Sequence, residues 1–160
     1  MNELIKIDIE KRILKLTFNR PKYKNAITLD MYSILAKEID SAKDNSEIRT
    51  ILISGAEGCF TSGNDLQDFM RNPPKSIDNN PVVDFMQALF SCPKPVVAAV
   101  EGLAIGIGTT LLLHCDLVYA SESAKFRLPF ANLGLSPEFV SSYLIPKMVG
   151  HAKASELLLL

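Results

Sequence analysis

An uninterrupted apolar run from Pro95 to Val100 constrains the fold more than any other part of the chain. Strands with one face in water alternate apolar and polar residues, whereas a continuous apolar run is typical of a strand in a parallel sheet that is covered on both faces. Glycines at positions 102, 106 and 108 follow the run and lead into an apolar pattern that reaches Leu113. This stretch therefore predicts a buried strand, a glycine-rich turn and a helix.

Strands and helices alternate along the rest of the chain. Apolar residues alternate with polar ones over 5–9 and 14–18, which predicts a hairpin of two half-buried strands that turns near Glu10 and Lys11. Thr28 is a candidate N-cap for a helix, because apolar residues recur after it at helical spacing. Further strands are expected over 48–54 and 117–120, helices over 82–91 and from Ser136 and His151, and a loop over 71–81. The alternation predicts an α/β fold, in one domain over 1–160.

The composition excludes several classes of protein. Hydrophobic residues make up 48% of the chain, enough apolar side chain to exclude disorder. The 17 basic and 18 acidic residues nearly cancel, so the sequence has no electrostatic footprint for nucleic acid or for an anionic membrane. Glu101 and the glycines interrupt the stretch from Pro95 to Leu113, which argues against a membrane span. Three cysteines, an odd number without a C-x-x-C pair, favour a reducing intracellular compartment.

Two glycine-bearing turns could bind an anion. The turns over 62–64 and 104–108 each follow an expected strand and open a helix, where unpaired backbone N–H groups and the helix dipole favour negative charge. Two such turns that face one point would form a pair of donors for an oxyanion. The alternative is that the glycines only allow tight corners. A dinucleotide-binding fingerprint is excluded, because Leu111 occupies the position of its third glycine, and no Walker motif is present.

Few other residues suggest chemistry. The segment Ser136-Pro137-Glu138 has the residues that capping favours at a helix start, so Glu138 is either a first-turn carboxylate or a functional one. The consecutive residues His114, Cys115 and Asp116 point in different directions on a regular element, which argues against a metal site. The sequence therefore predicts two anion-friendly turns and one candidate carboxylate.

Four segments in order along the chain resemble the signatures of the enoyl-CoA hydratase/isomerase (crotonase) superfamily. They are Asn19-Arg20-Pro21 with Asn25-Ala26-Ile27, the turn from Phe60 to Leu66, Pro93-Lys94-Pro95, and the turn from Gly102 to Gly108 followed by Cys115-Asp116. The resemblance covers essentially the whole chain. It implies a spiral of ββα units, with an acyl-CoA thioester held between the two turns as substrate and with no cofactor.

The resemblance also implies roles for particular residues. The two backbone N–H groups that bind the thioester oxygen fall on Asn64 and Ile107. Lys22 and Lys24 fall in the segment that runs near the CoA nucleotide, where they are either phosphate contacts or solvated lysines. The full expected set of substrate-binding residues is Lys24, Ala26, Ser62, Gly63, Asn64, Asp65, Leu66 and Gly106.

Hydratases of the superfamily use two glutamates to activate water, and these positions fall on Thr110 and Phe130, which cannot act as acid or base. The segment from Phe130 to Glu138 instead resembles the Δ3,Δ2-enoyl-CoA isomerase branch, especially its peroxisomal-type members. In that branch the glutamate after Ser-Pro is the catalytic base, so the resemblance implies that Glu138 moves the proton during isomerisation of 3-enoyl-CoA in fatty acid β-oxidation.

The chain departs from the family pattern in two ways. Phe139 stands where the family usually has glycine, and its side chain is expected to fill the acyl tunnel or to shift Glu138. The C-terminal helices that build the family's homotrimer are expected to lie beyond Leu160. Two alternatives stay open: a non-catalytic acyl-CoA-binding or interaction module of the chromodomain-Y-like type, and an inactive truncated isoform. By resemblance, the protein is expected in the peroxisome or the mitochondrion.

Overall fold

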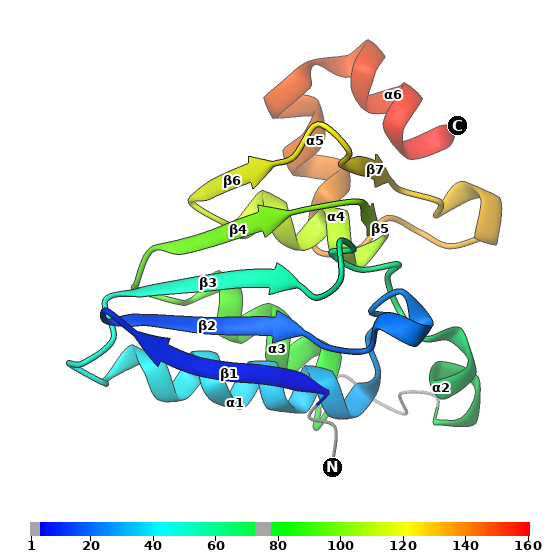
Figure 1. The fold of residues 1–160 in the computed structure, drawn as a ribbon. Coiled ribbons are helices and arrows are strands. Elements are labelled where there is room, and N and C mark those ends of the chain that lie inside the picture. The colour runs from blue at the N-terminus through cyan, green and yellow to red at the C-terminus, as the bar shows by residue number, and fades with distance from the viewer. Residues whose placement is uncertain (1–3, 73–77) are drawn as a thin grey trace.

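The computed structural model describes residues 4–72 and 78–160. Its largest element is a five-stranded sheet in the order β1-β2-β3-β4-β6 (Figure 1). The first two strands are antiparallel, and β2, β3, β4 and β6 are parallel. The strands are β1 (Ile5–Glu10), β2 (Ile13–Phe18), β3 (Thr50–Gly55), β4 (Val96–Val100) and β6 (Leu117–Ala120). The predicted hairpin and the three predicted single strands are therefore confirmed, with β3 starting two residues later than expected.

Two helices, α1 (Leu29–Lys43) and α3 (Pro81–Phe90), cover one face of this sheet (Figure 1). Thr28 caps α1 as predicted, because its side chain accepts a hydrogen bond from the Met31 N–H at 3.3 Å. The apolar faces of both helices pack on the sheet and form the main core with residues such as Leu16, Tyr32 and Phe85, which are fully buried. Burial of this apolar surface is the main stabilising contribution to the fold.

A second, small sheet was not predicted. It pairs β5 (Leu103–Ile105) with β7 (Lys125–Arg127) in parallel. Gly102, with φ of +64°, turns the chain out of β4 and directly into β5. Three-residue strands are too short to show a hydrophobic period, which is why sequence patterning missed both of them.

The helix expected to reach Leu113 is present in two forms. It begins as α4 (Ile107–Thr110) and continues without a break as the 3₁₀ helix η2 (Leu111–His114). The remaining elements of the structure are η1 (Pro21–Tyr23), α2 (Leu66–Arg71), η3 (Ala131–Leu133), α5 (Ser141–Val149) and α6 (His151–Leu159). The last two helices form a pair at the top of Figure 1 over a separate small apolar cluster, which includes Leu128, Phe130 and Ile145.

The prediction that a helix starts at Ser136-Pro137-Glu138 is wrong, whereas the start at His151 is confirmed. Helix α5 begins only at Ser141, because Phe139 and Val140 have left-handed φ angles of +49° and +59°. A right-handed helix cannot run through two such residues. Glu138 therefore precedes a turn instead of lying in the first turn of a helix.

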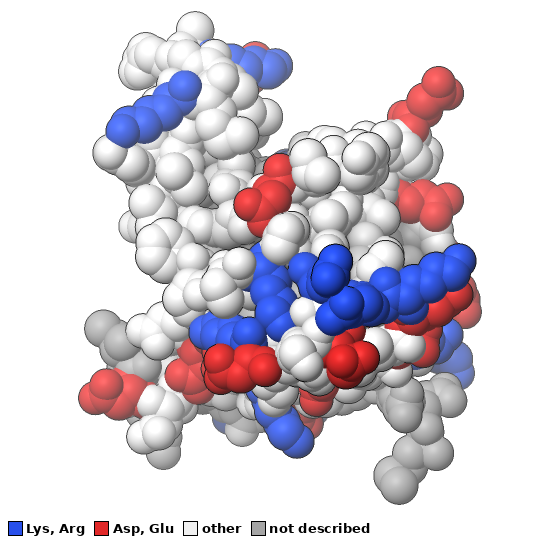
Figure 2. All heavy atoms as spheres, turned by 90° about the vertical axis from the view of Figure 1, so that its left-hand side faces the viewer, with Lys and Arg blue, Asp and Glu red and all other residues white. Residues whose placement is uncertain are grey.

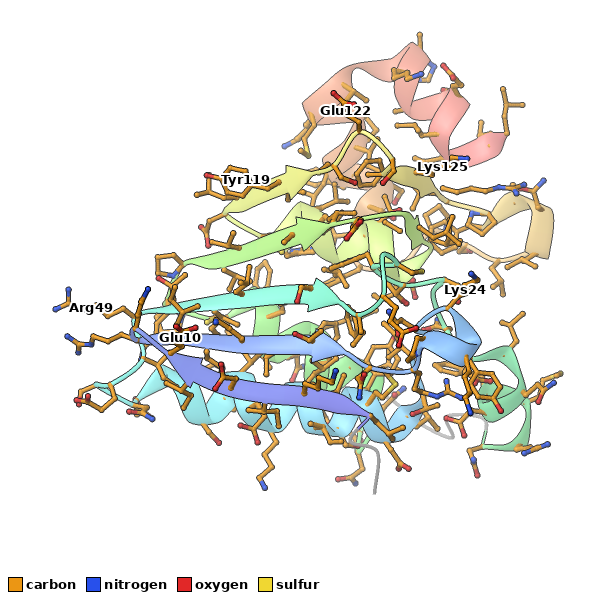
Figure 3. All side chains as sticks on the ribbon, viewed as in Figure 1. Glu10, Lys24, Arg49, Tyr119, Glu122 and Lys125 are labelled. Carbon is orange, nitrogen blue, oxygen red and sulfur yellow. The ribbon has the colours of Figure 1, made fainter. Side chains whose placement is uncertain are left out.

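The end of the sheet at which the parallel strands begin carries many charged side chains. Figure 2 views this end of the molecule and shows Lys and Arg side chains interleaved with Asp and Glu. Arg49 and Glu10 lie here (Figure 3), and Lys94 Nζ donates to the carbonyl oxygens of Asn45 and Ile48 at 2.6 and 2.8 Å. The Lys94 ammonium thus holds the backbone of the segment that leads into β3.

The loop expected over 71–81 falls in part on residues 73–77, which lie outside the described residues. Among the helices that the structure describes, none is long and apolar enough to cross a membrane.

Candidate active site

The first glycine turn follows the chain segment that pairs with β5. Gly63 has φ of +93°, and a Cβ at this position would lie 2.8 Å from the carbonyl oxygen of Ile105, so only glycine fits. On either side of Asn64 the backbone is bonded to Ile27, whose N–H donates to Gly63 O and whose carbonyl accepts from Asp65 N–H, both at 2.8 Å. Among the described residues, the N–H of Asn64 itself has no hydrogen-bond partner.

The second turn ends β5 and begins α4. Gly106 precedes the helix with φ of +56° and is held by its N–H, which donates to Arg127 O at 2.9 Å. Ile107 is the first helical residue, so its N–H has no partner inside the helix. In the part of the chain that the structure describes, no other group accepts from it. Both N–H groups that the resemblance assigns to an oxyanion are thus unpartnered.

The two turns touch each other. Thr61 pairs with Ala104 of β5: its N–H donates to Leu103 O at 2.8 Å, and its carbonyl accepts from Ile105 N–H at 3.1 Å. Gly108, four residues after Ala104, lies so close to Thr61 that a Cβ added to the glycine would be 2.5 Å from the methyl carbon of Thr61. The glycines therefore do more than allow tight corners, because Gly63 and Gly108 also permit this direct contact between the two turns.

A buried amide holds the first turn to the end of the sheet. Asn25 is fully buried, and its Nδ2 donates to the carbonyl oxygens of Ala56 and Cys59 at 3.0 and 2.6 Å. Its Oδ1 accepts from Arg20 N–H at 2.8 Å, and its own carbonyl accepts from Thr61 Oγ1 at 2.7 Å. Sequence reasoning missed this role, since the partners lie up to 36 residues away.

Tyr32 reaches the first turn from the core. Its hydroxyl donates to Asn64 Oδ1 at 2.5 Å, and the residue is fully buried between Phe69 and Phe85. Burial raises the pKa of this phenol well above its ordinary value, and the nearby Glu138 charge raises it further. Tyr32 therefore stays neutral and fixes the Asn64 side chain.

Both turns and Glu138 line one cavity of about 760 Å³. Its wall is largely apolar, which suits an acyl chain better than a charged group. The lining residues that the structure describes are Ser62, Gly63, Asn64, Leu66, Phe69, Met70, Ile105, Gly106, Ile107, Pro129, Phe130, Leu133, Leu135, Ser136 and Glu138.

Glu138 is the one ionisable side chain among those described lining residues. Burial in these apolar surroundings raises the pKa of its carboxyl group from 4.5 to about 7. A carboxyl group with this pKa can both accept and return a proton near neutral pH, which is the property expected of a general acid–base.

Phe139 does not fill the cavity, contrary to one of the two expected effects of its size. It is buried in the main core, and its ring stacks on His114 with centroids 3.6 Å apart. Its left-handed φ of +49° explains why a glycine is suited to this position. The cost of this conformation for phenylalanine is about 1–2 kcal/mol.

The positions of the two hydratase glutamates carry no acid or base. Thr110 is fully buried and donates to Ile107 O at 3.5 Å, whereas Phe130 is one of the residues that line the cavity. Groups of His, Cys, Asp and Glu that could hold a metal ion are absent from the described residues.

The expected substrate-binding residues divide into two groups. Ser62, Gly63, Asn64, Leu66 and Gly106 line the cavity. The other three lie outside the cavity lining, and they are Lys24, Ala26 and Asp65.

The three residues outside the lining lie beside the first turn and take part in the contacts that support it. Lys24 is exposed beside it (Figure 3), and its carbonyl accepts from Ser62 N–H at 2.9 Å. Asp65 caps α2 and forms an ion pair with Arg20 at 3.0 Å, while the Ala26 carbonyl accepts from the same guanidinium at 2.6 Å. Their observed contacts are thus within the protein.

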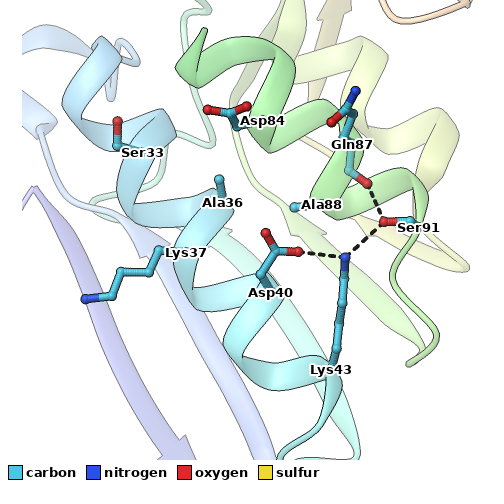
Figure 4. Close-up of a pocket in the computed structure, with 9 residues that line it drawn as sticks. All are labelled: Ser33, Ala36, Lys37, Asp40, Lys43, Asp84, Gln87, Ala88 and Ser91. Carbon is cyan, nitrogen blue, oxygen red and sulfur yellow. Dashed lines mark hydrogen bonds and ion pairs between the residues drawn. The ribbon is translucent and has the colours of Figure 1, made fainter. Parts of the chain in front are cut away.

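A second hollow lies on the outer side of α1 and α3, away from the two turns (Figure 4). Some of its polar groups are engaged with one another: Lys43 Nζ lies 2.6 Å from Asp40 and 2.9 Å from Ser91, whose hydroxyl donates to Gln87 O. The first cavity is therefore the better candidate for a binding site.

The contact between the turns generates a stability prediction. We expect Gly108→Ala to lower the free energy of unfolding by about 1–3 kcal/mol, because the new methyl group meets Thr61, whose hydroxyl bonds prevent it from rotating away. Thr61→Ser removes the opposing methyl and keeps the hydroxyl, so it should restore most of this loss in the double variant. Urea unfolding measures both effects, and an equally stable Gly108→Ala variant would contradict the proposed contact.

The buried amide of Asn25 generates a second stability prediction. We expect Asn25→Gly to lower the free energy of unfolding by about 3 kcal/mol, because it leaves the Ala56 and Cys59 carbonyls unsatisfied while glycine keeps the φ of +56°. Lys24→Gly is the matched control, since Lys24 has a φ of +52° and an exposed side chain. Its loss should stay below about 1 kcal/mol. Similar losses for the two variants in urea unfolding would argue against the amide network.

Comparison with known proteins identifies the family of the chain. Residues 8–160 match the family model described as enoyl-CoA hydratase/isomerase. The chain is 42% identical over 163 residues to human enoyl-CoA delta isomerase 2, covering 98% of this chain and 41% of that protein. It is 37% identical to 1,2-epoxyphenylacetyl-CoA isomerase of Escherichia coli K12, covering 100% of this chain and 63% of that protein.

A solved structure, that of Pseudomonas aeruginosa OdaA, superposes with a TM-score of 0.94 at 52% identity, covering 98% of this chain and 63% of that one. The chain thus spans about two fifths of the length of the human relative and somewhat under two thirds of the bacterial ones. It belongs to the enoyl-CoA hydratase/isomerase family, and the structure described above has the crotonase fold of that family.

Proposed function

We propose that the protein is a Δ3,Δ2-enoyl-CoA isomerase, which moves the double bond of a 3-enoyl-CoA to give the trans-2-enoyl-CoA. The observation that carries the proposal is what the described residues bring to the cavity: two backbone N–H groups without partners among those residues, at Asn64 and Ile107, and one carboxyl group with a pKa of about 7. The similarity to a human enoyl-CoA delta isomerase supports it.

The reaction needs one proton carrier and one anion site. The C2 proton of the substrate is acidified by the thioester and by the alkene, and the Glu138 carboxylate removes it. The electrons move into the thioester, and the dienolate oxygen accepts hydrogen bonds from the N–H groups of Asn64 and Ile107. Each donor of this kind is worth about 2.7–4 kcal/mol to the transition state. Glu138, now protonated, returns the proton to C4, so the double bond moves from C3–C4 to C2–C3.

The surroundings of Glu138 suit both steps. Its raised pKa makes the carboxylate a stronger base than an exposed one and leaves the acid able to reprotonate carbon near neutral pH. The largely apolar wall lowers the polarity around the dienolate, which strengthens the two hydrogen bonds. Water addition would need a second acid or base, and Thr110 and Phe130 supply none.

The proposal extends to the biological setting that the resemblance implies: unsaturated fatty acid β-oxidation, in the peroxisome or the mitochondrion, by a homotrimer. The alternative, a module that binds acyl-CoA without catalysis, would use the same turns and cavity. Glu138 favours the enzyme, because a buried carboxyl group adds nothing to the binding of a neutral acyl chain.

We expect Glu138→Gln to abolish isomerisation of 3-enoyl-CoA and to leave the Kd for a saturated acyl-CoA within about threefold, because the amide keeps the shape of the side chain and cannot carry the proton. Turnover is followed by the absorbance of the conjugated product, and binding by calorimetry. The matched control Glu122→Gln, an exposed carboxylate (Figure 3), should retain full activity. Turnover by Glu138→Gln at the parent rate would refute the assignment, and binding without turnover by the parent protein would favour the binding module.

The same substitution should also change stability with pH. Folded Glu138 keeps its proton up to a pH of about 7, whereas the unfolded side chain loses it near 4.5, so the parent's free energy of unfolding decreases as pH rises through this window. Glu138→Gln does not titrate. We expect it to match the parent near pH 4 and to exceed its stability by about 2 kcal/mol at pH 8, after allowance for the remaining exposure of the side chain. Urea unfolding across this range tests the sign, and a difference that does not vary with pH would contradict the raised pKa.

A further inference from the structure

His114 makes two different contacts with the residue that follows Glu138. Its imidazole stacks on the Phe139 ring, with centroids 3.6 Å apart and planes inclined by 18°. Its Nε2 lies 2.9 Å from the Phe139 carbonyl oxygen. A carbonyl only accepts, so Nε2 carries the hydrogen and donates. Burial lowers the pKa of His114 below 6.5, which keeps the ring neutral at physiological pH.

These contacts bear on a strained part of the backbone. Phe139 and Val140 are both left-handed, which non-glycine residues adopt only when their surroundings hold them there. On the other side of the turn, Ser141 fixes the Glu138 carbonyl, which accepts from its hydroxyl at 2.6 Å and from its N–H at 3.0 Å. The base is therefore presented by a short segment held at consecutive carbonyl groups, one by Ser141 and the next by His114.

The other end of the element that carries His114 lies at the anion site. Residues Ile107 to His114 form one continuous helical segment, α4 followed by η2. Its first residue, Ile107, supplies one of the two unpartnered N–H groups, and its last residue holds Phe139. A single continuous element thus spans from the proposed oxyanion donor to the turn that carries the proposed base.

We propose that His114 is a positioning residue, which sets Glu138 relative to the Ile107 N–H by holding the left-handed Phe139 turn. The inference rests on the proposed function for its kinetic meaning. His114 lies outside the cavity lining, so it acts on the reaction through Phe139 and touches no substrate. It also accounts for a phenylalanine at a position that suits glycine, since the stacked ring helps to hold the conformation that glycine would adopt freely.

The kinetic test compares two substitutions. We expect His114→Ala to lower kcat by about 10²-fold with KM within about twofold, because a misplaced base slows proton transfer while both turns still bind the substrate. His114→Phe keeps a stacking ring and loses only the hydrogen bond, so its loss should be about tenfold. The control is His151→Ala, the exposed histidine of α6, with unchanged kcat. Circular dichroism shows whether His114→Ala is folded, and if it is not, His114→Phe provides the measurement. A kcat within twofold of the parent value in either folded variant overturns the proposal.

A double variant tests whether the effect passes through Phe139. In a Phe139→Gly background the stacking partner is absent and glycine adopts the left-handed conformation without strain, so His114→Ala should cost no more than about tenfold. Losses that simply multiply would show that His114 acts by another route, which overturns the proposal.

A measurement that does not need turnover separates this inference from the proposed function. The pKa of the Glu138 carboxyl, followed by ¹³C NMR, should fall in His114→Ala from about 7 toward 4.5 as the side chain leaves its buried position. If the parent protein is inactive and the Glu138 pKa still falls in His114→Ala, the positioning role stands and the isomerase assignment is refuted. An unchanged pKa in the folded variant refutes the positioning role, whether or not the parent is active.

Discussion

The pairing of Thr61 with β5 is the contact on which the candidate site depends. The main sheet delivers two separate chain segments to the carboxyl ends of β3 and β4, and nothing in that sheet alone would bring their turns into register. Two hydrogen bonds between Thr61 and residues 103 and 105 do so, and Gly63 and Gly108 remove the side chains that would hold the turns apart. The unpartnered N–H groups of Asn64 and Ile107 follow from this geometry, because each lies just after the paired segment.

The polar interactions behind the turns serve the same end. Asn25, Arg20 and Tyr32 form hydrogen bonds to Thr61, Asp65 and Asn64 in the segment of the first turn. Preorganised donors are effective because they do not rearrange when charge develops on the bound oxygen. Burial acts on Glu138 in a related way. It raises the free energy of the carboxylate form, and the same burial makes the carboxylate a capable base.

Local patterns in the sequence predicted most of the main sheet and both covering helices. The alternation in β1 and β2, the apolar run of β4 and the Thr28 cap each depend on neighbours a few residues away, which is the range that such patterns report. The glycine turns were recognisable for the same reason. Glu138 gained a role only through the family resemblance, since its own surroundings in the sequence are those of an ordinary helix start.

The features that patterns missed are set by distant contacts. Strands β5 and β7 are too short to have a period, and the role of Asn25 depends on carbonyl groups beyond Gly55. The late start of α5 results from the left-handed Phe139 and Val140, and this conformation depends on His114, which lies 25 residues earlier in the chain. No residue near Phe139 in the sequence indicates such a partner.

The division of the apolar residues into two clusters has a dynamic consequence. Phe139 belongs to the main core, whereas Ile145 and the buried apolar residues of α6, Ala154 and Leu158, belong to the small cluster with Leu128 and Phe130. Small clusters open at a lower free energy than the global unfolding transition, so amide hydrogens in α5 and α6 should exchange faster than those in β2 to β4. Glu138 lies at the boundary between these two cooperative units. Local opening of the smaller one would release the Ser141 end of the turn that presents Glu138 and leave both anion-binding turns in place, so the anion site is more stable than the placement of the base.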